Sequence, residues 1–300
     1  MSRLSATALF VTLATMWGLS FPAISVGLEY LPPLLFAAFR YDTAALLLLG
    51  YAVVATDSWR PVGRNNLEAV LWGGLFLVAG NGLLFIGQQT VSSGVAAILQ
   101  ALVPIVTALF ALALLDERLS AVGSVGVALG FLGIGLIVQP DPNNLLAGDT
   151  VGRLIVLGQV VSVALGGVLV DRAAPSMERV AMTGWAMLVG GVVLHLLSLG
   201  AGERVPATLA APPALGAVIY LGVFSTALAF LIYFTILEER GAFETSLVAY
   251  LVPLVATAAG IFLLGESVGL LSIVGFVVVF AGFALLKRHA LVDLVAAGVS

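Results

Sequence analysis

The sequence predicts an all-α polytopic membrane protein whose ten transmembrane helices form two inverted five-helix repeats. Hydrophobic residues make up 61% of the 300 residues and charged residues 9%, whereas roughly a quarter of the residues in soluble domains are charged. Apolar stretches of helix length recur along the chain, and the second half repeats the first. A water-soluble core cannot absorb so much apolar surface, so the bilayer must be its solvent.

The repeat is visible without gaps at an offset of 149 residues. Residues 102–136 read LVPIVTALFALALLDERLSAVGSVGVALGFLGIGL, and residues 251–285 read LVPLVATAAGIFLLGESVGLLSIVGFVVVFAGFAL. Duplicated halves of this kind are typical of membrane proteins that move solutes. Identical pairs include Leu102/Leu251, Val103/Val252, Pro104/Pro253, Glu117/Glu266, Gly126/Gly275 and Gly133/Gly282.

A spanning helix needs about 20 mostly apolar residues. Ten segments meet this need: 5–27, 33–55, 67–89, 93–115, 120–139, 152–171, 180–200, 214–237, 242–264 and 268–287. The first is too long for a signal-peptide core, so we expect it to be retained. The longest polar stretch begins at Gln139, between the fifth and sixth spans. The sequence thus predicts a first repeat over 1–140, an external linker over 141–151, a second repeat over 152–288 and a cytoplasmic tail over 289–300.

Orientation follows from the positive charges in the loops. With the N-terminus inside, the outer loops hold only Arg153 and Arg204, and Arg40 lies within the second span. The inner segments hold the other nine: Arg3, Arg60, Arg64, Arg118, Arg172, Arg179, Arg240, Lys287 and Arg288. We therefore expect both termini to be cytoplasmic, in the inner (plasma) membrane. Because five spans is an odd number, the two repeats must face opposite ways.

Composition excludes several classes of function. Without cysteine there are neither disulfides nor thiolate metal sites, and the net charge of −4 forms no patch that would bind nucleic acid. No HExxH or nucleotide-binding glycine motif occurs, so we predict no cofactor and no metal. An intramembrane aspartyl protease needs two aspartates within spans, and only Asp42 is there. A small multidrug exporter would carry a glutamate in its first span, which has no acid here.

Glycine is frequent within the spans, with 34 residues in the chain. Small residues let helix backbones approach closely in lipid, so we expect these glycines to serve packing. Gly126 and Gly130 form a GxxxG pair, which leaves a homodimer open as an alternative use. The glycine-rich fifth and tenth spans are expected at the periphery of the bundle.

Polar residues within spans usually face protein or a water-filled cavity. Asn81 and Gln88 lie on one stripe of the third span, where they line a cavity or bond another helix. Arg40, early in the second span, is a helix–helix clamp or an anchor for a substrate carboxylate. Asp42 lies about 200° from it around the helix, which is poor geometry for a pair. His195 and Glu244 are expected to be structural, although Asp42 or Glu244 could carry a proton.

The fourth and ninth spans carry Pro104 and Pro253 at equivalent positions. Each proline removes one helical hydrogen bond and frees a carbonyl one turn back, at Gln100 and Ala249. Such broken turns are tolerated where they line protein or a cavity, so the pair predicts a substrate site or hinge, with a passive kink as the alternative. Glu117 and Glu266 follow these spans, and each is expected to cap the helix that comes after it.

These residues also carry a family resemblance over essentially the whole chain. Trp17-Gly18, Pro32-Pro33 with Arg40, Leu102-Val103-Pro104 with Asp116-Glu117-Arg118, and Tyr250-Leu251-Val252-Pro253 with Gly265-Glu266 resemble EamA-type proteins of the drug/metabolite transporter superfamily. The sixth span lacks the Trp often found there in the family. The resemblance implies ten helices around a central cavity that opens alternately to each side, and transport of small organic molecules, often amino acids.

We therefore expect a secondary transporter, not an enzyme, that exports small organic metabolites such as amino acids by alternating access. The alternatives are an exporter of hydrophobic drugs and a non-transporting membrane sensor. The expected partners are the bilayer and a small-molecule substrate, bound between spans one, three, four, six, eight and nine. The predicted substrate-binding residues are Trp17, Ser20, Asn81, Gln88, Gln100, Pro104, Tyr233, Tyr250 and Pro253.

Overall fold

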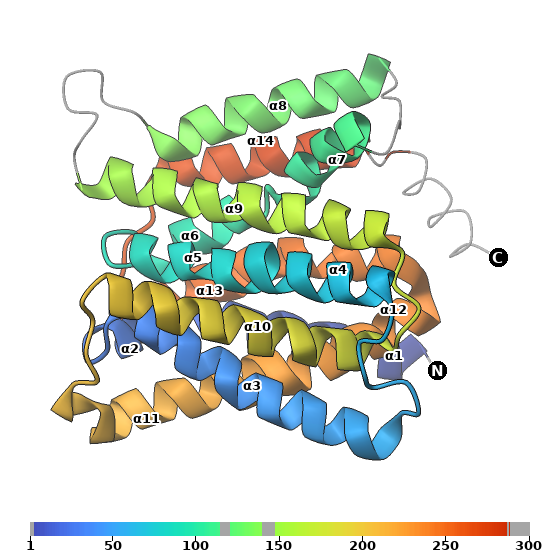
Figure 1. Cartoon of the computed structure of the whole chain (residues 1–300). Helices are drawn as coiled ribbons and strands as arrows, with labels where there is room; N and C mark the ends of the chain where they lie inside the picture. The colour runs from blue at the N-terminus through green and yellow to red at the C-terminus, as the bar shows by residue number, and fades with distance from the viewer. Residues whose placement is uncertain (1–2, 115–120, 140–147, 287, 289–300) are drawn as a thin grey trace.

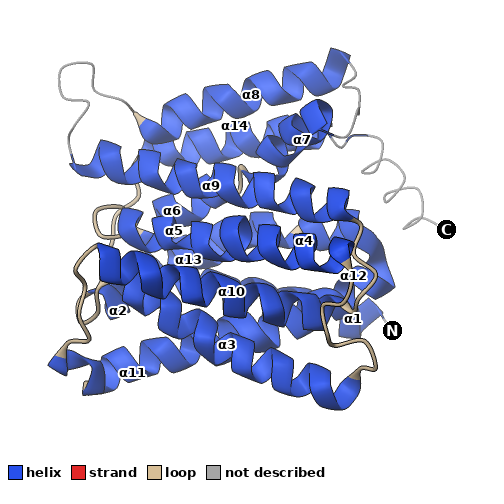
Figure 2. Ribbon diagram, viewed as in Figure 1, coloured by secondary structure: helices blue, strands red, loops and turns tan. Residues whose placement is uncertain are grey.

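A computed structural model describes residues 3–114, 121–139, 148–286 and 288. These residues form helices joined by short loops, and no strand occurs among them (Figure 2). The helices run side by side as one bundle (Figure 1). The beginning of the first helix and the end of the last described one lie on the right-hand side of Figure 1, together with the 56–63 and 174–178 loops. We call this side the predicted inner end and the opposite side the predicted outer end.

The first half of the chain forms five spans, of which three are interrupted. They are α1 (Arg3–Gly18) with α2 (Ser20–Leu28); α3 (Pro33–Ala55); α4 (Arg64–Trp72) with η1 (Gly73–Val78), η2 (Ala79–Asn81) and α5 (Gly82–Gly87); α6 (Ser93–Gln100) with α7 (Val103–Leu114); and α8 (Ala121–Val138).

The second half forms the other five spans and a short connecting turn, η3 (Ala207–Ala210). The spans are α9 (Gly148–Ala173); α10 (Arg179–Gly200); α11 (Pro212–Ile219) with η4 (Tyr220–Leu228) and α12 (Ala229–Ser246); α13 (Val248–Leu264); and α14 (Leu270–Leu286). Gly241, at φ +80°, turns the chain inside α12, so the ninth span begins there. Within the described residues, eight spans are long and apolar enough to cross a bilayer, and the apolar helices Val122–Val138 and Leu270–Leu286 are shorter. The predicted ten-span fold is confirmed.

Local sequence explains several boundaries. Pro33 and Pro212 begin their helices after an extended residue, because a fixed φ and a missing N–H suit the first helical position. Gly265 ends α13 in the left-handed conformation at φ +66°, which glycine adopts without a steric penalty.

The packing of the helices repeats when the two halves of the chain are exchanged. The first span packs on the ninth, and the sixth packs on the fourth; the second span packs on η4 of the eighth, and the seventh packs on η1 of the third. The contact of the third span with the sixth is likewise matched by the contact of the eighth with the first. The pairs two and seven, four and nine, and five and ten map onto themselves, and each of them is also in contact. Such exchange symmetry is expected for repeats related by a two-fold axis.

Glycines on α8 and α14 show the same symmetry at atomic scale. A Cβ atom at Gly126 would lie 2.5 Å from the carbonyl oxygen of Gly282, and one at Gly133 would lie 2.9 Å from that of Gly275. Gly126 is the repeat partner of Gly275, and Gly133 is the repeat partner of Gly282. Exchanging the two repeats therefore converts the Gly126–Gly282 contact into the Gly133–Gly275 contact. The glycines thus serve packing within the chain, with α8 at the margin of the bundle (Figure 1). The homodimer stays a prediction.

Two short π-helical segments also occupy repeat-related positions. Adding the offset of 149 residues to η1 (Gly73–Val78) gives residues 222–227, which lie within η4 (Tyr220–Leu228). Hydropathy does not predict these segments, because the wider hydrogen-bond ladder is set by packing. π-Helical turns are rare and occur frequently at functional sites.

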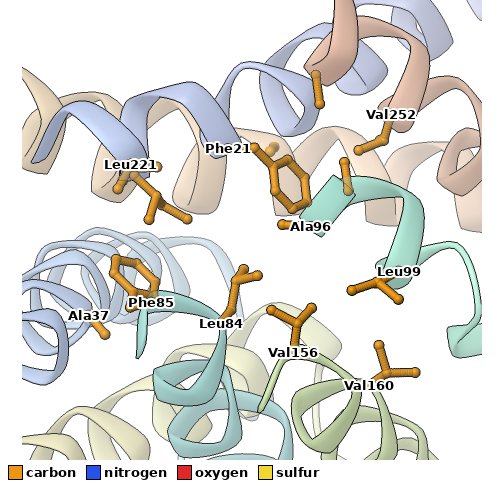
Figure 3. Packing of buried hydrophobic residues seen from close by; sticks show 14 of the residues in the cluster. Phe21, Ala37, Leu84, Phe85, Ala96, Leu99, Val156, Val160, Leu221 and Val252 are labelled. Atoms are coloured by element: carbon orange, nitrogen blue, oxygen red, sulfur yellow. The ribbon is translucent and has the colours of Figure 1, made fainter. Parts of the chain in front are cut away.

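The middle of the bundle is filled by apolar side chains from several spans. Figure 3 shows Phe21 of α2, Phe85 of α5, Leu99 of α6, Val156 of α9 and Leu221 of η4, which belong to one buried cluster. Phe85 meets Phe36 of α3 edge to face, with ring centroids 5.2 Å apart. These residues come mainly from the spans between which we predicted the substrate cavity, so their facing side chains pack together in this conformation.

Candidate functional site

Arg40 of α3 is buried between the second, third and eighth spans. Its Nε donates to the hydroxyl of Thr226 at 2.8 Å, and Thr226 in turn donates to the carbonyl of Leu221 at 2.6 Å. The guanidinium also lies 6.0 Å from the ring centroid of Phe85. The arginine therefore bridges the first repeat to the π-helical segment η4 of the second, as expected of a helix–helix clamp.

Asp42 of the second span and His195 of the seventh form a partly exposed polar pair. The Asp42 carboxylate and His195 Nε2 are 2.7 Å apart, between α3 and α10, and each side chain is 36% exposed. The His195 ring also packs edge-on against Phe39. His195 is thus hydrogen-bonded, as predicted for a structural histidine. Asp42 faces α10 and Arg40 faces η4, because residues two apart in a helix point to different sides of it.

The two amides predicted on the third span bond different neighbours. Asn81 Nδ2 donates to the carbonyl of Leu77 at 2.8 Å, and Asn81 Oδ1 accepts from Gln159 Nε2 of α9 at 3.0 Å. Gln88 Nε2 donates to the carbonyl of Phe21 at 3.1 Å and to the Ser25 hydroxyl at 3.3 Å. Both amides therefore tie the third span to other helices. Gln159 is not among the residues predicted from the sequence, where its only signal is one amide in an apolar span.

The bonds of Gln88 continue into a chain of polar groups at the predicted outer end. The hydroxyls of Ser25 and Ser93 are 3.0 Å apart. Ser93 donates its backbone N–H to Glu266 Oε2 at 3.0 Å and its hydroxyl to Oε1 at 2.9 Å. Glu266 therefore caps α6 of the opposite repeat. The prediction that it caps the helix following it was wrong, because the turn at Gly265 directs the carboxylate back to α6. Glu117 lies outside the described residues.

Aromatic residues of the first and eighth spans meet in the bundle. The ring centroid of Trp17 lies 5.6 Å from that of Tyr233 and 6.0 Å from that of Phe230. Ser20, predicted beside Trp17, donates its hydroxyl to the Trp17 carbonyl at 2.5 Å. Its polar group is thus satisfied within its own span.

The two prolines occupy different local structures. The fourth span is interrupted where predicted, because α6 ends at Gln100 and α7 begins at Val103, with Pro104 in the first turn. Pro253 lies inside the continuous helix α13, and the interruption of the ninth span falls at Leu247. The sequence repeat therefore does not impose identical breaks.

Tyr250 is directed toward the tenth span. Its ring centroid lies 4.5 Å from that of Phe283 and 5.1 Å from that of Phe280. Its hydroxyl is buried and has no hydrogen-bond partner among the described residues. The structure thus brings together Trp17 and Tyr233, and separately joins Gln88 to the first span. Asn81 and Tyr250 belong to other groups. Substrate contact by the nine predicted residues stays a prediction.

Two surface pockets of about 410 and 390 Å³ lie at the predicted inner end. One is lined by Gly63, Arg64, Leu67, Glu68, Leu71 and Trp72, and the other by Asp57, Ser58, Trp59, Arg60, Val62, Asn66, Ser176 and Met177. Neither contains a predicted substrate-binding residue. In the second, Asn66 Oδ1 accepts from the backbone N–H of Ser176 at 2.8 Å, which joins α4 of the third span to the loop before the seventh span.

Ten spans in two symmetric halves, with polar side chains bonded between the halves, define a multi-pass membrane protein of the transporter class. The chain belongs to the EamA-like transporter family, whose model matches residues 4–139 and 150–288. Its role is accordingly that of a transporter and not of an enzyme.

Individual relatives agree with this assignment. An inner membrane transporter of Escherichia coli K12, YedA, is 33% identical over 264 residues, which cover 87% of this chain and 83% of the relative. The transporter YvbV of Bacillus subtilis is 28% identical over 292 residues, covering 95% and 92%. A solved crystal structure matches with a TM-score of 0.64 over 96% of this chain and 98% of that one. At 19% identity this last likeness shows the fold alone.

Proposed function

We propose that the protein is a secondary transporter that exports small organic metabolites, such as amino acids, by alternating access. The observation that carries this proposal is the placement of its internal polar contacts. Arg40–Thr226, Asp42–His195, Asn81–Gln159 and Ser93–Glu266 each join a residue of the first repeat to one of the second. The interface between the repeats therefore holds polar groups that can separate and re-form when one repeat rocks against the other.

The membrane orientation is part of this proposal. The excess of Arg and Lys in the inner segments supports cytoplasmic termini in the inner (plasma) membrane. In that orientation the Ser93–Glu266 contact lies at the outer end, where it supports a conformation closed toward the outside. The two surface pockets then lie on the cytoplasmic side.

A polar substrate is favoured over a hydrophobic one by unpaired oxygens in the interior. Gln88 Oε1, Gln159 Oε1, Ser225 Oγ and Tyr250 Oη are buried without a partner among the described residues. A buried polar atom without a hydrogen bond costs about 1–3 kcal/mol. Such groups favour water or a polar substrate in the interior during the transport cycle, which an exporter of hydrophobic compounds does not need.

Transport assays with reconstituted protein test the proposal. Liposomes are loaded with individual labelled amino acids, and efflux is compared with protein-free liposomes. We expect efflux of at least one amino acid. Flux of hydrophobic dyes alone would favour the drug-exporter alternative, and binding without flux would favour the sensor.

A reversible cross-link at the predicted outer end then tests alternating access. Because the chain has no cysteine, the double variant Ser93→Cys/Glu266→Cys can be bridged by a short bis-methanethiosulfonate cross-linker, which forms a disulfide with each thiol by displacing methanesulfinate and is released by reduction. We expect bridging to stop efflux and reduction to restore it. Each single-cysteine variant, treated in the same way, is the matched control. Undiminished efflux after complete bridging would contradict a cycle that opens this contact.

A further inference from the structure

We propose that Arg40 anchors the carboxylate of the substrate, so that the transported compounds are organic acids or zwitterionic acids. This inference rests on the proposed transport function and names the substrate class.

Arg40 is a buried cation that has no counter-ion within the described part of the chain. Arg40 is only 8% exposed. No carboxylate of the described residues lies within 4.0 Å of its guanidinium, because every ion pair among those residues involves other groups. Of the five N–H donors that a guanidinium carries, Nε alone has a hydrogen-bond acceptor among the described residues, the Thr226 hydroxyl. A charge buried this way within a membrane is costly unless an anion joins it.

Two acids on or beside α3, Asp42 and Glu203, are already engaged. Asp42 is turned toward His195, with 2.7 Å between Oδ2 and Nε2. Glu203 accepts from the backbone N–H groups of Leu34 and Leu35 at 3.2 and 2.8 Å, which caps α3. Both carboxylates therefore have other partners, and the described part of the chain supplies no anion to the guanidinium.

The position of Arg40 suits a transported anion. Helix α3 begins at Pro33, and Arg40 lies seven residues later. Its Cα is therefore about 10 Å along the helix axis from the start of α3, which places it within the hydrocarbon layer. Its guanidinium contacts the eighth span through Thr226 and the third through Phe85. Both spans belong to the set predicted to surround the substrate.

The groups beside Arg40 can complete a carboxylate site. Thr226 holds Nε, which leaves the two Nη groups free to bind a carboxylate through parallel hydrogen bonds. Ser225, the neighbour of Thr226, is fully buried, and its hydroxyl has no partner among the described residues. Both residues belong to the π-helical segment η4, a kind of turn frequent at functional sites. Local rearrangement of η4 would present this hydroxyl as a further donor.

Matched acid and amide pairs test the proposal. Purified protein in lipid nanodiscs is titrated with glutamate and glutamine, leucine and leucinamide, and lactate and lactamide, and the unfolding temperature is measured. Inorganic phosphate is a separate arm. We expect at least one acid to stabilise the protein and its amide to have no effect. In Arg40→Gln the apparent affinity for that acid should fall roughly thirtyfold or more, as for other buried charge pairs that lose one partner.

Three further variants keep the result interpretable. Arg64→Gln is the matched control, because Arg64 pairs with Glu68 on an exposed surface, and it should bind the acid normally. Thr226→Val keeps the arginine charge but removes its orienting acceptor, so binding should weaken even if Arg40→Gln does not fold. Arg40→Lys should be intermediate, since an ammonium group cannot form the two parallel bonds.

The proposal is overturned if no acid stabilises the protein, if phosphate alone does so, if amides act as well as acids, or if Arg40→Gln binds the acid normally. Efflux assays separate this failure from failure of the transport function. Efflux of amides but not of acids would refute the anchor and leave a transporter, whereas absence of any efflux would count against transport itself.

Discussion

Removing the Glu266 carboxylate should loosen the predicted outer end of the protein. In Glu266→Ala, Ser93 loses the acceptors of both its backbone N–H, at 3.0 Å, and its hydroxyl, at 2.9 Å. The first turn of α6 then has no side-chain cap, because its N-cap residue Ser92 makes no capping hydrogen bond. The contact between the fourth span and the turn after the ninth should open more often.

The free energy lost in Glu266→Ala follows from the two hydrogen bonds that the carboxylate accepts. A hydrogen bond to a charged group contributes about 1.5–3 kcal/mol. Glu266 is only half-buried, so water replaces part of what is lost, and about 2–3 kcal/mol is a reasonable sum for both bonds. That energy corresponds to a roughly 30- to 150-fold rise in the population of the open outer end.

Thiol labelling can measure this change. Ser25→Cys places a thiol beside Ser93, where the native hydroxyls are 3.0 Å apart, in a chain without other cysteines. We expect a water-soluble maleimide to react roughly 30 to 150 times faster when Glu266→Ala is added. Glu68→Ala is the control, because its exposed ion pair with Arg64 is worth at most about 1 kcal/mol. Equal labelling rates with and without Glu266 would refute the reasoning.

Three further predictions concern topology, packing and the helix break. Reporter fusions after residues 148 and 288 should report outside and inside respectively, and the same side for both would contradict inverted repeats. Gly126→Ala should lower the unfolding temperature in detergent, because overpacking costs about 1–3 kcal/mol. Gly135→Ala, where a Cβ atom meets nothing within 4 Å, should not. Pro104→Ala should change the efflux rate more than the unfolding temperature, and wild-type efflux would leave the proline a passive kink.

Much of the fold was predictable because its signals are local. The second span was predicted at 33–55 and is α3, Pro33–Ala55, since paired prolines fix its start and polar residues follow its end. The breaks within spans were less predictable. Pro104 accompanies the interruption after Gln100, whereas Pro253 lies in a continuous helix. A proline removes one helical hydrogen bond, and the neighbouring helices decide whether the helix opens there.

The candidate site was predictable only in part. Arg40, Asn81 and Gln88 are recognisable in the sequence as polar residues inside spans, and the structure assigns their bonds to Thr226, Gln159, Phe21 and Ser25. Gln159 was not predicted, and the helix predicted to be capped by Glu266 was the wrong one. A glutamate beside a helix start is a good cap for that helix, but a fold can bring another helix start closer.

The sequence by itself determined the solvent, the number of spans and the duplication. Hydropathy is a sum over neighbouring residues, and the repeat is a comparison of the chain with itself, so neither needs coordinates. Only the tertiary structure decided which polar groups meet. Arg40 and Thr226 are 186 residues apart in sequence, and Ser93 and Glu266 are 173 apart. Contacts over such separations depend on how ten helices pack, because a rotation of one helix redirects every side chain on it.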